Sequence, residues 1–277
     1  MAVFYIPGER KTRPGVFYRY ENWGAPPLAG AADGRCAAVF ASNWGPMTQV
    51  VIEKSEDIEK VYGDGGANGT TAVPIEQFKG GARLVFAVRV GVGGAKGSYQ
   101  IKDTAEAPVL QLTMLYPGSK EFAITIRPTL ADPDIAELLI LEGTTELERI
   151  AFPATAGSDQ VSALMDTVAT AGSKYFTLTK IADSVEAIAT VDQDPITAGT
   201  DPTVNAGAYS AAFEALEASR WNVLAVDTSD PAIHLLTQMY LNRIYAGGKF
   251  VMGVIGEPGT GVGAVPFETR LKCLLQE

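Results

Sequence analysis

A strand, a helix and a second strand follow one another within residues 221–256, and this succession constrains the fold more than any other part of the sequence. WNVLAVD (221–227) and KFVMGVIG (249–256) are short apolar runs of the kind that form buried strands. Between them, Asp230 is placed to cap a helix and Pro231 to occupy its first position, and Gly247-Gly248 ends it. We therefore expect a parallel, right-handed βαβ crossover here.

The same pattern of buried strands and short helices is found in the first hundred residues. Two buried strands and two short helices are predicted there: RCAAVFASNWGP (35–46), SEDIEKVYGDGG (55–66), TAVPIEQFKGG (71–81) and ARLVFAVRV (82–90). Ser55 is the expected N-cap of the first helix and Gly63 its end. A further helix is predicted over 208–220, with Tyr209, Phe213 and Leu216 on one face. These segments predict an α/β fold with a three-layer core and a mostly parallel sheet.

Between about 100 and 203 the pattern changes to short alternating runs separated by Pro, Gly, Asp and Ser. The runs are PVLQLTML, EFAITIRP, AELLILEG, TELERIAFP, KYFTLTKI and VEAIATV, and they favour an all-β, sandwich-like domain. One helix interrupts them over 158–172, with Val161, Leu164 and Val168 on one face. We therefore expect an N-terminal arm (1–24), a discontinuous α/β core (25–99 and 204–277) and an inserted β domain (100–203).

Charge is unevenly distributed along the chain, whose formal net charge is −10. Residues 1–20 carry four basic side chains and one acidic one, whereas residues 100–200 carry six basic and fifteen acidic ones. The acidic middle argues against nucleic-acid binding, and we expect it on the outside of any assembly.

Targeting and cysteine patterns point to synthesis in a reducing cytoplasm. The apolar runs are far shorter than a membrane span, and the N-terminus lacks the basic region of a signal peptide. Cys36 and Cys273 are too far apart in sequence to suggest a disulfide framework or a zinc site. No cofactor, metal or membrane insertion is expected.

Catalytic patterns are weak. His234 is the single histidine, and without a second histidine or a G-x-S-x-G elbow a Ser-His-Asp triad cannot be built. Asp230 is better explained as a helix cap, and Asp227 alone makes no acid/base pair. The alternative function is ligand binding or hydrolysis by an α/β protein that uses the glycine-rich loop 256–264.

The basic, aromatic stretch KTRPGVFYRY (11–20) is the strongest functional signal. Residues 1–24 hold six of the 24 aromatic side chains, which require burial. After the turn at Pro14-Gly15, Val16, Tyr18 and Tyr20 alternate with Phe17 and Arg19 at the period of a strand. Two interpretations stay open: an edge strand of the chain's own sheet, or a strand added to the sheet of a neighbouring copy.

In this order, several segments resemble the contractile tail sheath proteins of contractile-tailed bacteriophages and phage-tail-like bacteriocins. They are RPGVFYRYENW, YPGSKEFAITI, DPITAGTDPTV, AYSAAFEALEASRWNVLAVDTSD and GGKFVMGVIGE. The resemblance implies a non-enzymatic building block with a core of subtilisin-like topology. Such subunits stack as hexameric rings around an inner tube and contract to drive the tube through a target envelope.

The same resemblance implies the partners and the location. Partners would be other copies of the chain, the inner tail tube protein, and baseplate and terminator proteins. The subunit would assemble in the bacterial cytoplasm and then belong to a virion tail or a released tail-like particle. The inter-subunit arm would be the strand formed by Arg13, Pro14, Gly15, Val16, Phe17, Tyr18, Arg19 and Tyr20. Family members usually continue past GGKFVMGVIGE into a C-terminal region with a second arm, which we expect to be missing here.

Overall fold

In the computed structural model, which describes residues 34–64, 70–154, 159–256 and 271–274, six strands form one mixed sheet. Its strands are β13 (Leu271–Leu274), β12 (Met252–Gly256), β11 (Val223–Val226), β1 (Arg35–Phe40), β3 (Leu84–Arg89) and β2 (Val50–Ile52), in spatial order. β1 pairs in parallel with both β3 and β11, and β11 pairs in parallel with β12. The edge strands β2 and β13 are antiparallel to their neighbours.

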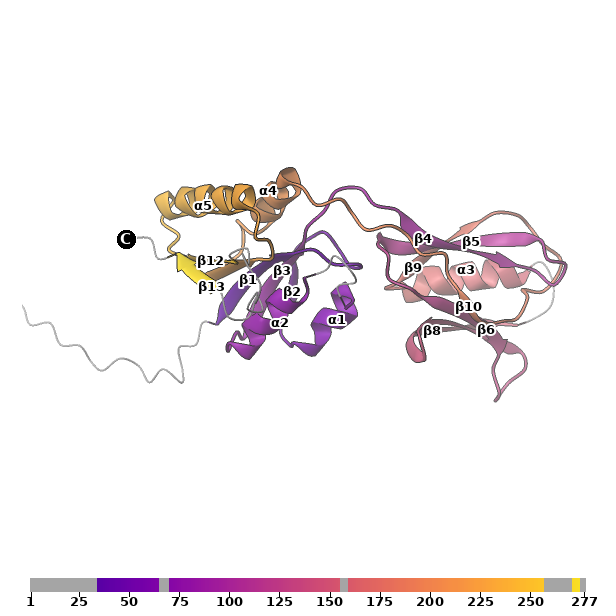
Figure 1. The fold of residues 1–277 in the computed structure, drawn as a ribbon. Helices are drawn as coiled ribbons and strands as arrows, with labels where there is room; N and C mark the ends of the chain where they lie inside the picture. The colour runs from indigo at the N-terminus through magenta and orange to yellow at the C-terminus, as the bar shows by residue number, and fades with distance from the viewer. Residues whose placement is uncertain (1–33, 65–69, 155–158, 257–270, 275–277) are drawn as a thin grey trace, which may run out of the picture. The chain divides into compact units, whose positions relative to one another are not determined.

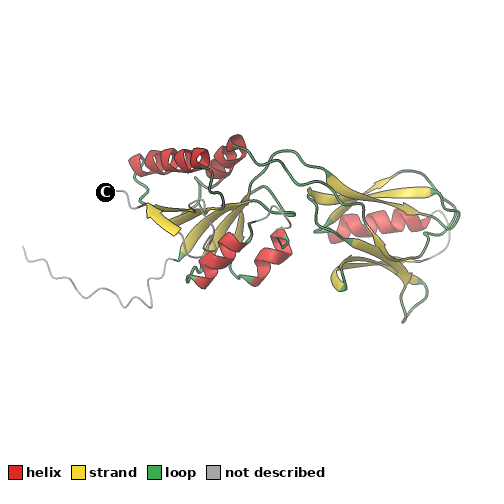
Figure 2. Cartoon of the chain, in the orientation of Figure 1, coloured by secondary structure: helices red, strands yellow, loops and turns green. Residues whose placement is uncertain are grey.

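Helices cover both faces of this sheet (Figures 1 and 2). They are α1 (Glu56–Tyr62), α2 (Ala72–Lys79), α4 (Ala206–Ala215) and α5 (Pro231–Ala246). Alternate residues of β1 divide between two cores: Ala37 and Val39 pack with α4 and α5, whereas Ala38 and Phe40 pack with α1 and α2. The period of two along a strand thus produces the predicted α/β layering.

Residues 96–195 form two antiparallel sheets and one helix. The first sheet has the order β10 (Val191–Pro195), β6 (Ala123–Pro128), β7 (Ile135–Glu142) and β8 (Thr145–Pro153). The second has the order β4 (Lys96–Lys102), β5 (Pro108–Pro117) and β9 (Phe176–Lys180). Helix α3 (Asp159–Ala171) contacts β8 of one sheet and β9 of the other. Its predicted face is buried, because Val161, Leu164 and Val168 belong to the core that the two sheets share.

The chain passes between the α/β part and the β part twice, and the two passages are bonded to each other. Bridges pair Val92 with Thr203 and Ala95 with Thr200, although these residues are distant in sequence. Gly118 lies so close to the core that a Cβ there would be 1.9 Å from the backbone oxygen of Asn43. All described residues belong to a single compact unit.

The structure corrects several details of the predictions. Ser55 precedes α1, but its backbone is helical and its side chain makes no capping hydrogen bond. VEAIATV (185–191) is not a strand: the strand begins at Val191, where the backbone pairs with Ile126 of β6. Strand β4 begins inside the glycine-rich segment GVGGAKGS, and neither it nor β2 was expected.

Candidate functional site

The residues predicted to form the inter-subunit strand, Arg13, Pro14, Gly15, Val16, Phe17, Tyr18, Arg19 and Tyr20, lie outside the described residues. So does the glycine-rich segment 256–264, except for Gly256 at the end of β12. Among the described residues, the places where a strand from elsewhere could pair are the edges of the sheets. Those edges, and the surfaces beside them, are the candidate assembly site.

Strand β2 is the edge of the six-stranded sheet whose side chains are described. Its partner is β3, with Val51 opposite Phe86. Among the described residues no strand pairs with the outer side of β2. Val51, in the middle of the strand, is 48% exposed, whereas Ile52 is buried in the core under α1 and α2. An edge with an exposed branched side chain and unpaired backbone groups is ready to accept another strand.

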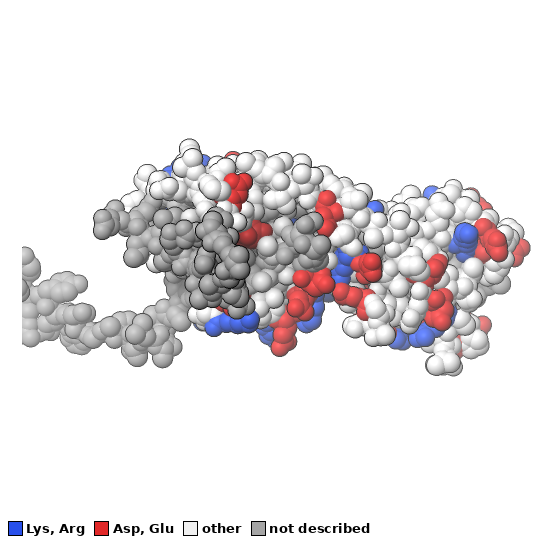
Figure 3. Space-filling view, viewed as in Figure 1, with Lys and Arg blue, Asp and Glu red and all other residues white. Residues whose placement is uncertain are grey.

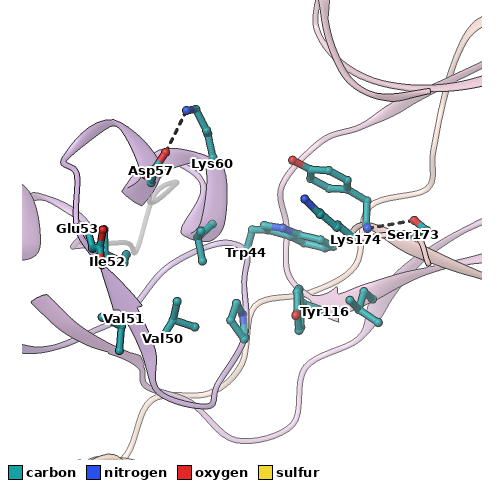
Figure 4. A pocket seen from close by; sticks show the side chains of 14 residues that line it. Trp44, Val50, Val51, Ile52, Glu53, Asp57, Lys60, Tyr116, Ser173 and Lys174 are labelled. Atoms are coloured by element: carbon teal, nitrogen blue, oxygen red, sulfur yellow. Dashed lines mark hydrogen bonds and ion pairs between the residues drawn. The ribbon is translucent and has the colours of Figure 1, made fainter. Parts of the chain in front are cut away.

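A groove of about 820 Å³ lies beside this edge (Figure 4). We call it the β2 groove. Its lining comes from the loop after β1, from β2 itself, from α1, from the end of β5 and from the loop before β9: Trp44, Pro46, Val50, Val51, Ile52, Glu53, Asp57, Lys60, Val61, Leu115, Tyr116, Ser173, Lys174 and Tyr175. The volume is in the range of about 300–1,000 Å³ that ligand sites occupy.

Aromatic rings form one wall of the β2 groove. Trp44 meets Tyr116 edge to face, with ring centroids 5.4 Å apart, and meets Phe122 in the same way at 4.8 Å. Trp44 is almost fully buried, so its position is fixed by the core of the β part. Burial raises the pKa of the Tyr175 hydroxyl, and the nearby carboxylates of Glu148 and Glu142 raise it further. The wall is thus aromatic and anchored in the core of the β part.

Charged side chains of both signs line the β2 groove: the carboxylates Glu53 and Asp57 and the lysines Lys60 and Lys174. The segment 53–60 carries four carboxylates and two lysines. Lys60 forms an ion pair with Asp57 at 3.1 Å, and this hydrogen bond raises the pKa of the Lys60 ammonium. Figure 3 shows acidic side chains over the part of the surface where α1 lies in Figure 1.

Asp227 lies where β11 ends, beside the end of the parallel neighbour β1. This is the place where open α/β sheets bind ligands. Its carboxylate accepts hydrogen bonds from the Ala41 amide at 2.7 Å, from the Tyr209 hydroxyl at 2.5 Å and from the Thr70 hydroxyl. Burial and the Asp227 charge together raise the pKa of Tyr209. The carboxylate is engaged in joining β1, β11 and α4, which is a structural role.

His234 and Asp230 are also structural, as the sequence suggested. The Nε2 atom of His234 is 2.8 Å from the Thr228 carbonyl oxygen, and the histidine is half-buried on α5. Asp230 caps α5 by accepting from the Ala232 amide at 2.9 Å. Within the described part of the chain, no group of three His, Cys, Asp or Glu side chains is arranged to hold a metal ion.

The β2 groove was not foreseen in the sequence. Its aromatic residues, Trp44, Tyr116 and Tyr175, come from three segments that only the tertiary fold brings together. The Asn-Trp-Gly-Pro segment after β1 was interpreted as the end of a strand, and it does end one. None of the described helices is both long and apolar enough to cross a membrane.

Two solved structures share the fold. The chain is similar to a sheath tail protein from Listeria innocua, with a TM-score of 0.59 and 21% identity over 79% of this chain and 47% of that one. It is similar to a sheath tail protein from Desulfitobacterium hafniense, with a TM-score of 0.59 and 19% identity over 86% of this chain and 52% of that one. No protein-family model and no curated protein matches. The chain thus spans about half the length of these two sheath tail proteins and has the fold of the part that it spans.

Proposed function

We propose that this protein is a structural subunit of a contractile tail sheath and has no enzymatic activity. The observation that carries the proposal is the shared fold, which extends over 79% and 86% of the chain in comparison with two sheath tail proteins. The engaged carboxylate of Asp227 supports it further, because the usual ligand-binding place of the α/β sheet holds a structural cluster instead. No described residue favours the alternative of a ligand-binding or hydrolytic protein that uses loop 256–264.

The proposal includes the arrangement of the whole assembly. Copies of the chain stack as hexameric rings around an inner tail tube, between baseplate and terminator proteins, and contract to drive the tube through a target envelope. The core (25–99 and 204–277) has a subtilisin-like topology. The inserted domain (100–203) lies on the exterior, which fits the many exposed carboxylates of this segment, among them Glu106, Asp166 and Asp192. The arm (1–24) links neighbouring copies through a strand formed by residues 13–20.

Electron microscopy of the purified chain over a range of concentrations tests the proposal. Rings, tubes or sheath-like polymers are the expected result. Discrete monomers at every concentration, in the presence and absence of the inner tube protein, would contradict it.

Deletion of residues 1–20 tests the role of the arm. The shortened chain should keep its circular dichroism spectrum and thermal unfolding but lose long polymers. A chain that lacks residues 1–9 keeps the predicted strand and is the matched control. Normal polymers from the chain without residues 1–20 would remove the arm from the proposal.

A further inference from the structure

Two aromatic side chains are exposed between the end of α5 and the start of β12. Tyr245 lies in the last turn of α5 and is 47% exposed, and Phe250 lies two residues before β12 and is 74% exposed. Their rings meet edge to face, with the centroids 5.0 Å apart. We call this pair the aromatic knob. Aromatic side chains bury large apolar areas, so an exposed pair of them is a feature of surfaces that contact another molecule.

The basic side chains beside the aromatic knob are engaged within the chain. Arg243 forms an ion pair with Glu217, and the ammonium group of Lys249 donates to the carbonyl oxygen of Ser219. The partner surface that matches the knob is therefore apolar and carries no large net charge.

The β2 groove is a surface of this kind. Rings of Trp44, Tyr116 and Tyr175 line it, and its two carboxylates are matched in number by its two lysines. Aromatic rings pack favourably on one another edge to face. A groove of about 820 Å³ is in the size range that holds a drug-sized molecule, so the two rings of the knob can enter it.

The aromatic knob and the β2 groove lie on opposite sides of the six-stranded sheet. The knob adjoins β12, whereas the groove adjoins β2 at the far edge (Figure 1). Three strands separate β12 from β2, which is about 19 Å at the usual strand spacing, so the two surfaces cannot meet within one copy. A contact between two different surfaces of identical copies is heterologous, and heterologous contacts generate rings or helical polymers.

The size of the aromatic knob favours a repeated partner over a single tight one. Each aromatic side chain buries at most about 150–250 Å², whereas a stable complex buries about 800 Å² on each partner. A contact of this size is weak when it is made once, and it becomes effective where each copy makes several contacts at the same time. The occupant that fits the groove is therefore the knob of a second copy within a polymer.

Resting on the function proposed above, we propose that Tyr245 and Phe250 of one copy insert into the β2 groove of the next copy. The contact joins opposite sides of neighbouring copies and is separate from the N-terminal arm. Leu130, in the turn between β6 and β7, is the competing occupant, because its side chain is fully exposed.

Disulfide trapping between full-length copies tests the assignment. One copy carries Phe250→Cys and a mass tag, the other carries Val51→Cys, and both carry Cys36→Ala and Cys273→Ala. Mixed under mild oxidation, they should form a disulfide between tagged and untagged chains. Val185→Cys replaces Val51→Cys as the matched control, because Val185 is more exposed, at 76%, and does not line the groove. Leu130→Cys replaces Phe250→Cys to sample the competing occupant.

The outcomes separate this contact from the sheath function. A product between positions 250 and 51 that exceeds both controls at least about tenfold supports the contact. No product, equal yields with Val185→Cys, or a preferred product with Leu130→Cys overturns it, even if microscopy shows sheath-like polymers. If the trapped product forms but the chain without cysteine substitutions makes no polymers at any concentration, the contact stands and the sheath function fails.

A charge exchange provides a second test without cysteines. Phe250→Asp places a charge on the knob and Val51→Lys places one in the groove, and both positions are exposed enough to leave the thermal midpoint nearly unchanged. Each variant alone should need at least about tenfold higher concentration to self-associate in sedimentation velocity experiments on the full chain. An equimolar mixture should associate more strongly than either variant, because the carboxylate then enters the groove beside the lysine.

Leu130→Asp is the matched control, since it places the same charge on another exposed apolar residue. It should leave self-association unchanged. A mixture that associates no better than the separate variants, or a Leu130→Asp chain that is weakened as much as the Phe250→Asp chain, would contradict the contact.

Discussion

Arg89 holds its guanidinium in the joint between the two parts of the molecule, where its side chain is only 1% exposed. It donates to the carbonyl oxygens of Ser42, Gly45 and Pro117, at 2.8–3.1 Å. Burial lowers the pKa of Arg89 to about 10. Each of these carbonyl groups would lose its donor if the side chain were removed, and an unsatisfied buried group is costly.

Arg89→Met should therefore lower the free energy of unfolding by about 2–4 kcal/mol. Chemical denaturation of the full chain measures the change. Arg220→Met is the matched control, because Arg220 is exposed and its replacement should change stability by less than about 0.5 kcal/mol. An effect of the same size at both positions would show that the carbonyl contacts of Arg89 add nothing.

Tyr240 and Tyr209 differ in one respect that a phenylalanine substitution can measure. Both are buried, but among the described residues the Tyr240 hydroxyl has no hydrogen-bond partner, whereas the Tyr209 hydroxyl donates to Asp227. Tyr240→Phe should be neutral or stabilising by up to about 1 kcal/mol, and Tyr209→Phe should cost about 1.5–3 kcal/mol. Paired urea titrations give both values. If Tyr240→Phe lost as much stability as Tyr209→Phe, the Tyr240 hydroxyl would have to form a hydrogen bond after all.

At the scale of single elements, helix α5 shows what an N-cap contributes. Asp230 has an extended backbone and its carboxylate accepts from the Ala232 amide, so Asp230→Ala should destabilise the protein by about 1 kcal/mol. Ser55 occupies the same position before α1 without a capping bond, so Ser55→Ala should change stability by less than about 0.5 kcal/mol. Thermal unfolding compares the two. Equal losses would mean that the side-chain bond is irrelevant.

The elements that could be predicted from the sequence are those with explicit boundary signals. Helix α5 begins after Asp230 and ends at Gly247, as expected, because a cap, a proline and paired glycines mark its limits. Strand β2 escaped prediction because three residues show no periodicity. The strand predicted for VEAIATV was wrong because apolar alternation alone does not determine which residues pair. Strand β6 pairs instead with the largely polar residues that follow, in β10.

The candidate site was much less predictable than the fold. Residues 11–20, whose basic and aromatic character predicts a strand that is buried against another sheet, lie outside the described residues. The β2 groove depends on rings from β5 and from the loops after β1 and before β9, which converge only in the folded protein. The hydrogen bonds that Asp227 accepts from Tyr209 and Thr70 could not be deduced from the spacing of these residues in the sequence.

At the scale of the whole molecule, alkaline pH should weaken the fold. Burial raises the pKa values of Tyr62, Tyr209 and Tyr240, and raises that of Tyr99 to about 12. In the unfolded chain these tyrosine hydroxyls release their protons near the ordinary pKa of about 10, so above that pH the unfolded chain binds fewer protons than the folded chain. The lowered pKa of Arg89 makes the fold more stable as pH rises, but one arginine opposes four tyrosines, and the net effect is a loss of stability.

The contribution of Tyr99 to the free energy of unfolding is therefore fully present below about pH 10 and is lost as pH rises toward 12. The denaturant midpoint measured at about pH 11 should be lower than the midpoint at about pH 9, and tyrosinate absorbance should rise together with unfolding. Tyr99→Phe should make the fall shallower. A midpoint that is constant or rises over this interval would contradict the expectation.

The inserted segment should fold when expressed alone, with reduced stability. Its two sheets and α3 share one core, but that core also contains Trp44 from the α/β part. Loss of a buried tryptophan typically costs about 3–5 kcal/mol. We expect residues 95–200 to give dispersed heteronuclear NMR spectra and an early denaturation midpoint, and Trp44→Ala in the full chain to show a similar loss. A collapsed, poorly dispersed spectrum would count against an autonomous domain.

The two bonded passages between the parts have a consequence for the order of folding. Val92 and Thr203 are joined by a bridge although about 110 residues separate them along the chain. Closing an unfolded loop of about 100 residues costs about 2 kcal/mol more chain entropy than closing one of about ten residues. An insertion that folds first brings its own ends together and removes most of that cost before β11 must find β1. The parallel sheet would then form around a loop that is already closed. The pairing of β11 with β1, which are far apart in the sequence, would be a search between segments that the folded insertion holds close together.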